Sequence, residues 1–174
     1  MRGIVLIGYR GCGKSTVGRL VADRLQLPFV DMDERIAQRA GRSIADIFAE
    51  DGEQVFRKLE SEMIGEFASN NPSVLSVGGG AVLREDNVAR LREHGTVVWL
   101  KADAGTLWAR IARDAASVHQ RPPLTRLSGV AEVIQVLAER EPLYQSAAHH
   151  VVDAAGDDPA AVAQRILRIL GAAS

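Results

Sequence analysis

The chain of 174 residues has little cysteine, lysine or aromatic side chain, and its charges nearly cancel. A single cysteine, Cys12, excludes a disulfide framework within the chain and suits a reducing compartment. The 21 basic and 22 acidic residues give a net charge of −1, which leaves no overall field to attract nucleic acid or an anionic membrane. No apolar run approaches the roughly 20 residues that cross a bilayer. These absences predict a cytoplasmic protein without a nucleic-acid or membrane partner.

What is present is the composition of an ordinary globular domain, 47% hydrophobic and 25% charged. The length suits one domain, and no repeat, low-complexity tract or linker interrupts it, so we predict a single domain over residues 1–174. Of the 21 basic residues 18 are arginine, so guanidinium groups carry most of the positive charge. Nothing in the sequence demands a dimer, and we expect a monomer.

Short apolar segments alternate with helical patterns along the chain. Strands are predicted at 3–7, 28–30, 74–77, 96–100 and 151–152. Helices are predicted at 14–25, 34–40, 44–50, 53–69, 85–94, 104–113, 130–141 and 160–170. Buried strands separated by helices predict an α/β fold, a five-stranded parallel sheet flanked by helices on both faces.

The segment from Gly8 to Ser15, GYRGCGKS, matches the phosphate-loop pattern G-x-x-x-x-G-K-S between a buried strand and a helix. Glycines let backbone N–H groups turn toward phosphate oxygens at the helix N-terminus. Lys14 is then the cation for the β- and γ-phosphates, and the Ser15 hydroxyl is a magnesium ligand. A glycine-rich turn without a ligand is the alternative. Cys12 has no second thiol to pair with, so we interpret it as a small side chain tolerated beside the phosphates.

Two acids, Asp31 and Asp33, flank Met32 at the end of the second predicted strand. In an extended chain this spacing sends both carboxylates to one side, at the sheet edge where such folds bind ligands. One carboxylate near Mg²⁺ and one that accepts or orients a hydroxyl proton suit phosphoryl transfer to an alcohol. Two acids that merely cap the next helix are the alternative.

Two further segments are candidates for binding an acceptor molecule. Arg57 and Glu60 are three residues apart on a predicted helix, so Glu60 is placed to hold the guanidinium as a receptor for a carboxylate. An exposed ion pair is the alternative. Gly78-Gly79-Gly80 follows the third strand and would bring backbone close to a bound molecule, whereas a plain loop is the alternative.

Together with Arg121-Pro122 and the segment from Arg140 to Tyr144, these features resemble shikimate kinase, in the family's order and approximate spacing from residue 3 to about 160. The resemblance implies a P-loop kinase with a substrate-binding segment at about 32–62 and a mobile lid at about 114–124. It implies transfer of the γ-phosphoryl group of ATP to the 3-hydroxyl of shikimate, with Mg²⁺ as cofactor. The products are shikimate 3-phosphate and ADP, in aromatic amino-acid (chorismate) biosynthesis.

The resemblance also implies a role for each matching residue. Catalytic roles go to Lys14, Asp33 and Arg121. The nucleotide is expected to contact Gly11, Cys12, Gly13, Lys14, Ser15, Thr16, Arg113, Arg121 and Pro159. Shikimate is expected to contact Asp33, Arg57, Gly78, Gly79, Gly80 and Arg140. Mg²⁺ is expected to bind Ser15 directly and Asp31 and Ser76 through water.

Two departures from the family pattern stand out. The lid reads Arg121-Pro122-Pro123-Leu124 in place of the usual Arg-Pro-Leu-Leu, and residues 154–158 carry no basic side chain near the expected adenine site. Two other functions compete: a kinase of the same fold acting on gluconate or a nucleoside monophosphate, and a nucleotide-binding switch without catalysis.

Overall fold

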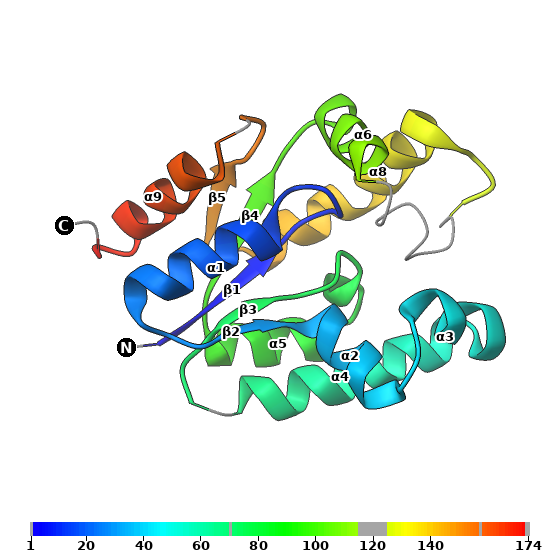
Figure 1. Ribbon diagram of the computed structural model, residues 1–174, viewed down its shortest axis with the longest axis horizontal. Helices are drawn as coiled ribbons and strands as arrows, with labels where there is room; N and C mark the ends of the chain where they lie inside the picture. Colours follow the sequence, from blue (N-terminus) through cyan, green and yellow to red (C-terminus); the bar gives the residue numbers. More distant parts are fainter. Residues whose placement is uncertain (1, 70, 115–124, 157, 173–174) are drawn as a thin grey trace.

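Five parallel strands form the centre of the protein in a computed structural model that describes residues 2–69, 71–114, 125–156 and 158–172. The strands are β1 (Gly3–Ile7), β2 (Phe29–Asp31), β3 (Val74–Ser76), β4 (Gly95–Lys101) and β5 (His150–Asp153). Their spatial order is β2-β3-β1-β4-β5, so β1 is the central strand (Figure 1). The predicted α/β fold with a five-stranded parallel sheet is confirmed.

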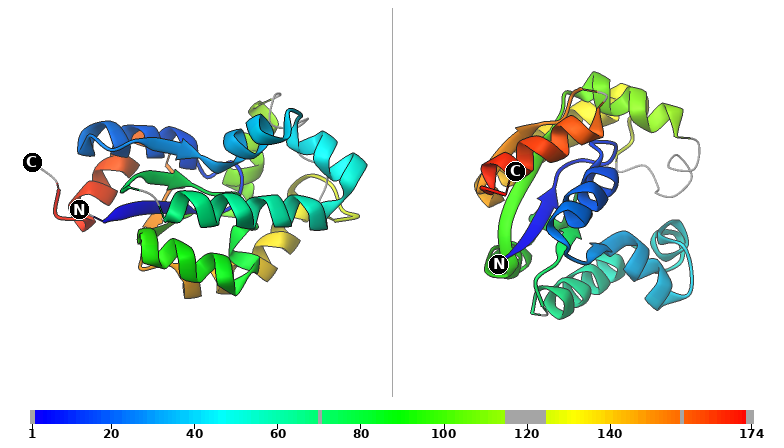
Figure 2. Two further views of the ribbon diagram at one scale, coloured as in Figure 1. Left: turned by 90° about the horizontal axis from the view of Figure 1, so that it is seen from below. Right: turned by 60° about the vertical axis from the view of Figure 1, so that its left-hand side comes forward.

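Helices connect the strands and cover both faces of the sheet (Figures 1 and 2). Apolar residues of α1 and α9 pack on one face, and those of α4 and α5 pack on the other. The helices α2 and α3 lie beyond the end of β2, whereas α6 lies beyond β4 (Figure 1). The helices are α1 (Lys14–Leu25), α2 (Met32–Ala40), α3 (Ile44–Asp51), α4 (Glu53–Ala68), α5 (Glu85–His94), α6 (Ala104–Arg113), α8 (Gly129–Ala147) and α9 (Pro159–Ile169), with a 3₁₀ turn η1 (Ala81–Leu83).

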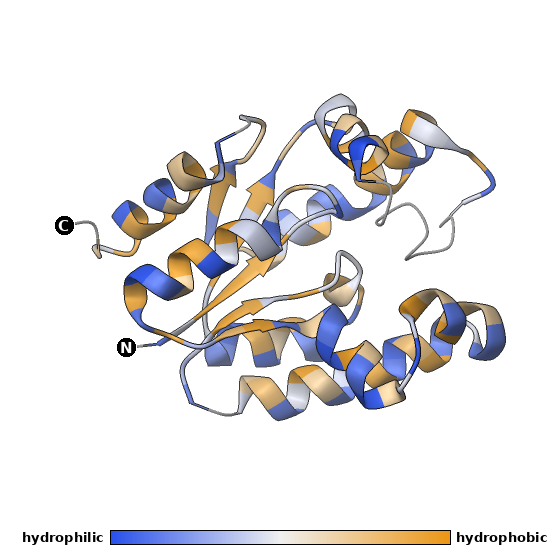
Figure 3. Cartoon of the chain, viewed as in Figure 1, coloured by the Kyte–Doolittle hydropathy of each residue, from blue (hydrophilic) through white to orange (hydrophobic). Residues whose placement is uncertain are grey.

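The core is divided between the two faces of the sheet. On β1, Ile4 and Leu6 pack with α1 and α9, whereas Val5 and Ile7 pack with α4 and α5. Alternate side chains of a strand point to opposite faces, and here both faces are covered. A strand buried on both faces reads as a continuous apolar run, which is how β1 appears in the sequence and in Figure 3.

Side-chain caps set several helix boundaries where the sequence predicts them. Ser43 and Asp46 form a reciprocal capping box at the start of α3. Asp103 accepts from the Thr106 N–H at the start of α6, and Asp158 precedes Pro159 at the start of α9. Short polar motifs therefore fix the helix starts on both sides of the sheet.

Two elements differ from the prediction. The chain turns into α2 directly after Asp31, so Asp33 lies in the first helical turn and not on extended strand. The helix α8 continues through Pro142 to Ala147, although a proline removes one N–H donor from a helix. Tyr144 and Ala147, after the proline, are buried in the core, and this packing outweighs the lost hydrogen bond. Within the described ranges, no helix is long and apolar enough to cross a membrane.

Candidate active site

The phosphate loop runs from the end of β1 to the start of α1. Gly8, Gly11 and Gly13 have φ of 140°, 82° and 93°, in the region that favours glycine. Gly13 precedes α1 and has no side chain to cap it, so the first N–H groups of the helix are available to an anion. The backbone thus forms the anion cradle that the motif predicts.

Lys14 lies folded over this loop. Its Nζ donates to the carbonyl oxygens of Gly8 and Tyr9 at 2.8 and 3.0 Å, and lies 3.6 Å from the Cys12 Sγ. Cys12 is 1% exposed, and its side chain packs in the apolar cluster between α1 and the sheet. These carbonyl oxygens hold the ammonium group of Lys14 over the loop.

Two adjoining hollows surround the loop on its nucleotide side. The larger, of about 350 Å³, is lined by Lys14, Ser15, Thr16 and Ser76 among others, and the smaller, of about 190 Å³, by Cys12, Gly13, Thr16 and Pro159 among others. Seven of the predicted nucleotide-contact residues therefore line one continuous region: Gly11, Cys12, Gly13, Lys14, Ser15, Thr16 and Pro159.

An arginine that the sequence analysis missed, Arg110 on α6, lines both hollows. Its guanidinium donates to the Gly11 carbonyl at 3.4 Å and to the Ala155 and Gly156 carbonyls at 3.2 and 2.5 Å. Among the described residues of α6, Arg113 lines neither hollow and is exposed at the helix end. The resemblance assigns a nucleotide contact on this helix to Arg113, and that role stays a prediction. Arg110 also supplies the positive charge that residues 154–158 lack.

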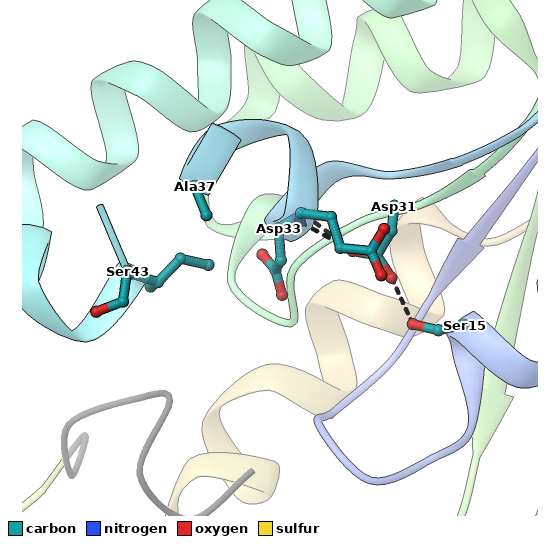
Figure 4. Close-up of a pocket in the computed structure, with 7 residues that line it drawn as sticks. Ser15, Asp31, Asp33, Ala37 and Ser43 are labelled. Carbon is teal, nitrogen blue, oxygen red and sulfur yellow. Dashed lines mark hydrogen bonds between the residues drawn. The ribbon is translucent and has the colours of Figure 1, made fainter. Parts of the chain in front are cut away.

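Oxygen ligands gather where the loop meets β2 and β3. Ser15 Oγ donates a 2.5 Å hydrogen bond to Asp31 Oδ2, while Asp31 Oδ1 accepts from the N–H groups of Asp33 and Glu34 (Figure 4). Ser76 lines the same hollow. Hydroxyl and carboxylate oxygens suit Mg²⁺, which keeps several waters and shares its shell with phosphates. Within the described parts of the chain, no three His, Cys, Asp or Glu side chains form a closed metal site. The residues present therefore suit a metal held jointly with a nucleotide.

A second hollow of about 350 Å³ lies on the acceptor side, between α2 and the start of α3. Ser15, Asp31 and Asp33 line it together with Ala37 and Ser43 (Figure 4). Because Ser15, Asp31 and Asp33 also line the larger nucleotide-side hollow, the two spaces meet at these side chains. The predicted acid pair is thus placed between the nucleotide and acceptor sides, although a helix turn and not an extended strand brings the acids together.

Arg57 on α4 is held by carboxylates of its own helix. Its Nη1 donates to Glu60 Oε2 at 2.7 Å, and its Nε and Nη2 each lie 3.2 Å from Glu53 Oε1. The Glu60 side chain is 1% exposed, whereas that of Glu53 is 54% exposed. Burial raises the pKa of Glu60, and the positive charges of Arg57 and Arg140 oppose that rise. Both arginines are thus within electrostatic reach of one buried carboxylate.

The three glycines after β3 are buried beneath these arginines. The Arg57 guanidinium lies so close over Gly80 that a Cβ there would overlap it. At Gly79 a Cβ would lie 3.5 Å from Arg140 Nη1 and 3.3 Å from both the Gly8 carbonyl oxygen and the Tyr144 hydroxyl. The structure therefore brings Gly79, Gly80, Arg57 and Arg140 together, close to the start of the phosphate loop. Arg121 lies outside the described residues, and its role stays a prediction.

Comparison with known proteins agrees with this geometry. A family model described as "SKI: Shikimate kinase" matches residues 10–171. The chain is 48% identical over 173 residues to a shikimate kinase of Oleidesulfovibrio alaskensis, with 99% of both chains covered. It is 43% identical over 167 residues to shikimate kinase 2 of Yersinia enterocolitica, covering 96% of this chain and 94% of the relative.

The chain belongs to the shikimate kinase family. It is an ATP-dependent kinase of small molecules, and the family's activity is phosphorylation of shikimate. A solved structure of shikimate kinase from Acinetobacter baumannii in complex with shikimate superposes with a TM-score of 0.91 at 33% identity, covering 98% of this chain and 93% of that one.

The competing gluconate kinase hypothesis finds support in the fold alone. A gluconokinase of Sinorhizobium meliloti superposes with a TM-score of 0.59 at 19% identity, over 98% of this chain and 91% of that one. The full-length identity to shikimate kinases favours shikimate over gluconate. The two arginines beside the triple glycine suit the carboxylate of either acceptor and argue only against a nucleoside monophosphate.

Proposed function

We propose that this chain transfers the γ-phosphoryl group of ATP to the 3-hydroxyl of shikimate, and that the acid pair lies between the two substrates. One observation carries the assignment of the acceptor: Arg57 and Arg140 converge on Gly79 and Gly80, with Glu60 buried among them. Two guanidinium groups against a bare backbone suit a small, flat molecule that bears a carboxylate. The carboxylate end of shikimate is assigned here.

The phosphates of ATP are assigned to the loop at residues 8–15 and to Lys14. Mg²⁺ is the metal we assign to Ser15, with Asp31 and Ser76 acting through water, and it supplies charge neutralisation for the β- and γ-phosphates. Arg110 and Pro159 line the adjoining hollow, where the adenine end of the nucleotide fits. The residues that bind the two ends of ATP thus come from the loop after β1 and from elements that follow β4.

Asp33 is assigned to the acceptor hydroxyl. As the 3-hydroxyl oxygen bonds to the γ-phosphorus, the bond from that phosphorus to the bridging β,γ-oxygen breaks, and ADP leaves. The hydroxyl proton is released as the new bond forms, and the Asp33 carboxylate is placed to orient the hydroxyl and accept that proton. The protein contributes mainly by positioning the two substrates and neutralising charge, because it forms no covalent bond with the phosphoryl group.

The direct test is ADP release from Mg-ATP with shikimate, gluconate, CMP and AMP as separate acceptors. We expect shikimate alone to raise the rate well above the acceptor-free background. A rate that rises with gluconate or a nucleoside monophosphate would favour the competing kinase reading. Nucleotide binding with no acceptor-dependent release would favour the switch.

We also infer that the chain acts as a monomer in the cytoplasm. Cys12 lies beside Lys14 in the phosphate loop, so a reducing compartment keeps the loop chemically intact. Light scattering of the pure protein should give a mass near 18.7 kDa, with and without substrates.

A further inference from the structure

Tyr144 lies beside the glycines and arginines of the acceptor side, and the proposed function gives it no role. It is completely buried on α8, and its hydroxyl donates a 2.6 Å hydrogen bond to the Gly79 carbonyl. Its ring packs against Trp99 of β4, with centroids 5.6 Å apart and planes tilted by 34°. The ring is thus fixed by the core of the sheet, while the hydroxyl reaches the loop that follows β3.

The hydroxyl lies where three separate segments meet. A Cβ on Gly79 would lie 3.3 Å from the Tyr144 hydroxyl, 3.3 Å from the Gly8 carbonyl and 3.5 Å from Arg140 Nη1. Arg140 and Tyr144 are four residues apart on α8 and therefore share a helix face. That face exists because α8 continues through Pro142, which lies between them. The phosphate loop, Arg140 and the Tyr144 hydroxyl therefore meet around Gly79.

The chemistry of this hydroxyl suits a fixed donor. Burial raises the pKa of Tyr144 far above its ordinary value, so the group stays neutral and protonated at any working pH. The Gly79 carbonyl that it satisfies is buried in the same region. Loss of the donor would leave that carbonyl without this hydrogen bond, and a buried acceptor that loses its donor costs more than the bond contributes.

We propose that Tyr144 is a positioning residue for the acceptor: its hydroxyl fixes the Gly79 carbonyl and so holds the Gly79–Gly80 backbone and Arg140 as one surface for the shikimate ring and carboxylate. The proposal rests on the proposed function, because the readout is the affinity for shikimate. It assigns no contact between Tyr144 and the substrate. Its effect passes through Gly79 and Arg140.

The test compares Tyr144→Phe with the wild type. The variant keeps the ring and its packing on Trp99 and removes only the hydroxyl. We expect the KM for shikimate to rise about 5- to 20-fold, from the loss of one buried hydrogen bond. The kcat and the KM for ATP should each stay within about threefold, since the nucleotide contacts lie elsewhere.

The matched control is Ser61→Ala, which also deletes a buried hydroxyl. Ser61 lies on α4 and is 8% exposed, and its hydroxyl has no hydrogen-bond partner among the described residues. Its KM for shikimate should change less than twofold. If Tyr144→Phe lowers Tm but leaves that KM unchanged, or raises the KM for ATP equally, the hydroxyl is only structural and the proposal is overturned.

Gly79→Ala by itself keeps the idea testable if Tyr144→Phe folds poorly, and a double-mutant cycle combines the two substitutions where both single variants fold. The alanine methyl would lie tight against the Tyr144 hydroxyl and the Gly8 carbonyl oxygen, both at 3.3 Å, so it should raise the KM for shikimate by itself. The two substitutions disturb one contact, so together they should raise the KM less than the product of their separate effects. Independent effects would contradict the proposal. If the wild type shows no shikimate-dependent ADP release, the proposed function has failed instead.

Discussion

Asp31 accepts hydrogen bonds both from the start of α2 and from the phosphate loop. The sequence left open whether the acid pair caps a helix or serves the site. One carboxylate oxygen caps α2 through the N–H groups of Asp33 and Glu34, while the other accepts from Ser15 in the phosphate loop. The capping and functional interpretations of the acid pair are therefore compatible. The cap fixes the carboxylate, and the fixed carboxylate is ready for a metal-bound water.

We expect Asp33 to act on the acceptor hydroxyl during phosphoryl transfer itself, whereas Asp31 acts on the metal. Asp33→Asn should lower kcat by at least about 10²-fold if the carboxylate accepts or orients the hydroxyl proton, because the amide is a poor base of the same shape. Steady-state ADP release at saturating shikimate and ATP measures it. A kcat near that of the wild type would remove Asp33 from this role.

Glu60 and Glu53 form a matched pair of acids on Arg57, one buried and one exposed. Glu60→Gln should raise the KM for shikimate about 10-fold, because the guanidinium loses its buried charged partner at 2.7 Å. Glu53→Gln should raise it less than twofold, since an exposed pair is weakened by solvent. Equal effects of the two substitutions would show that burial does not decide which acid holds Arg57.

At the scale of elements, α6 is tied to both sides of the nucleotide region by one arginine. Arg110 joins the phosphate loop at Gly11 to residues 155–156, which follow β5. A single guanidinium group thus hydrogen-bonds to two loops that are far apart in the sequence. The helix α6 acts as the support for that bridge.

Arg110→Ala should therefore raise the KM for ATP about 10-fold and leave the KM for shikimate within about twofold. Arg113→Ala, three residues further along α6 and exposed, should leave both values near those of the wild type. Initial rates at varied ATP and fixed shikimate separate the two variants. A larger effect of Arg113→Ala would instead support the assignment of the nucleotide contact to Arg113.

We expect the pairing of β4 with the start of β5 to depend on pH through His149. The Val97 N–H donates to His149 Nδ1 at 2.9 Å, and the His149 N–H donates to the Val97 carbonyl at 2.8 Å. Burial lowers the pKa of His149, and the charges of Arg92, His150 and Arg2 lower it further. The folded state therefore favours the neutral ring, which can accept the Val97 N–H.

We expect acid to destabilise the fold through His149. The unfolded chain protonates this histidine first, near its ordinary pKa of about 6.5, so the stabilisation is complete above that pH and declines below it. His149→Asn should flatten the fall in Tm between pH 7.5 and 5 by about 1–3 °C, and His150→Asn should not. Thermal unfolding at a series of pH values measures this, and parallel Tm curves for the wild type and His149→Asn would contradict it.

At the scale of the whole molecule, the alternation of strands and helices was enough to predict the sheet. The strands β1, β3 and β4 are largely buried, so their apolar runs stand out in the sequence. Polar caps such as Ser43, Asp103 and Asp158 mark where helices begin. The phosphate loop could also be predicted from the sequence, because its backbone geometry requires glycine at fixed positions.

The rest depends on contacts that no local pattern contains. The helix α8 crosses Pro142 because Tyr144 and Ala147 are buried against the sheet, and the sequence shows the proline but not that packing. Arg110 and Tyr144 act on loops that lie 99 and 65 positions away in the chain, at Gly11 and Gly79. Contacts of this kind can be predicted only when the spatial order of the strands is known.

The placement of β1 between β3 and β4 has a consequence for how such kinases diversify. The acceptor-side elements α2, α3 and α4 all belong to the single connection from β2 to β3, whereas the phosphate loop follows β1. The β2–β3 connection therefore supplies Asp33 and Arg57 to the acceptor side, whereas Gly79, Gly80 and Arg140 come from the loop after β3 and from α8. Changes of acceptor that spare the phosphate loop would have to be coordinated among these three segments.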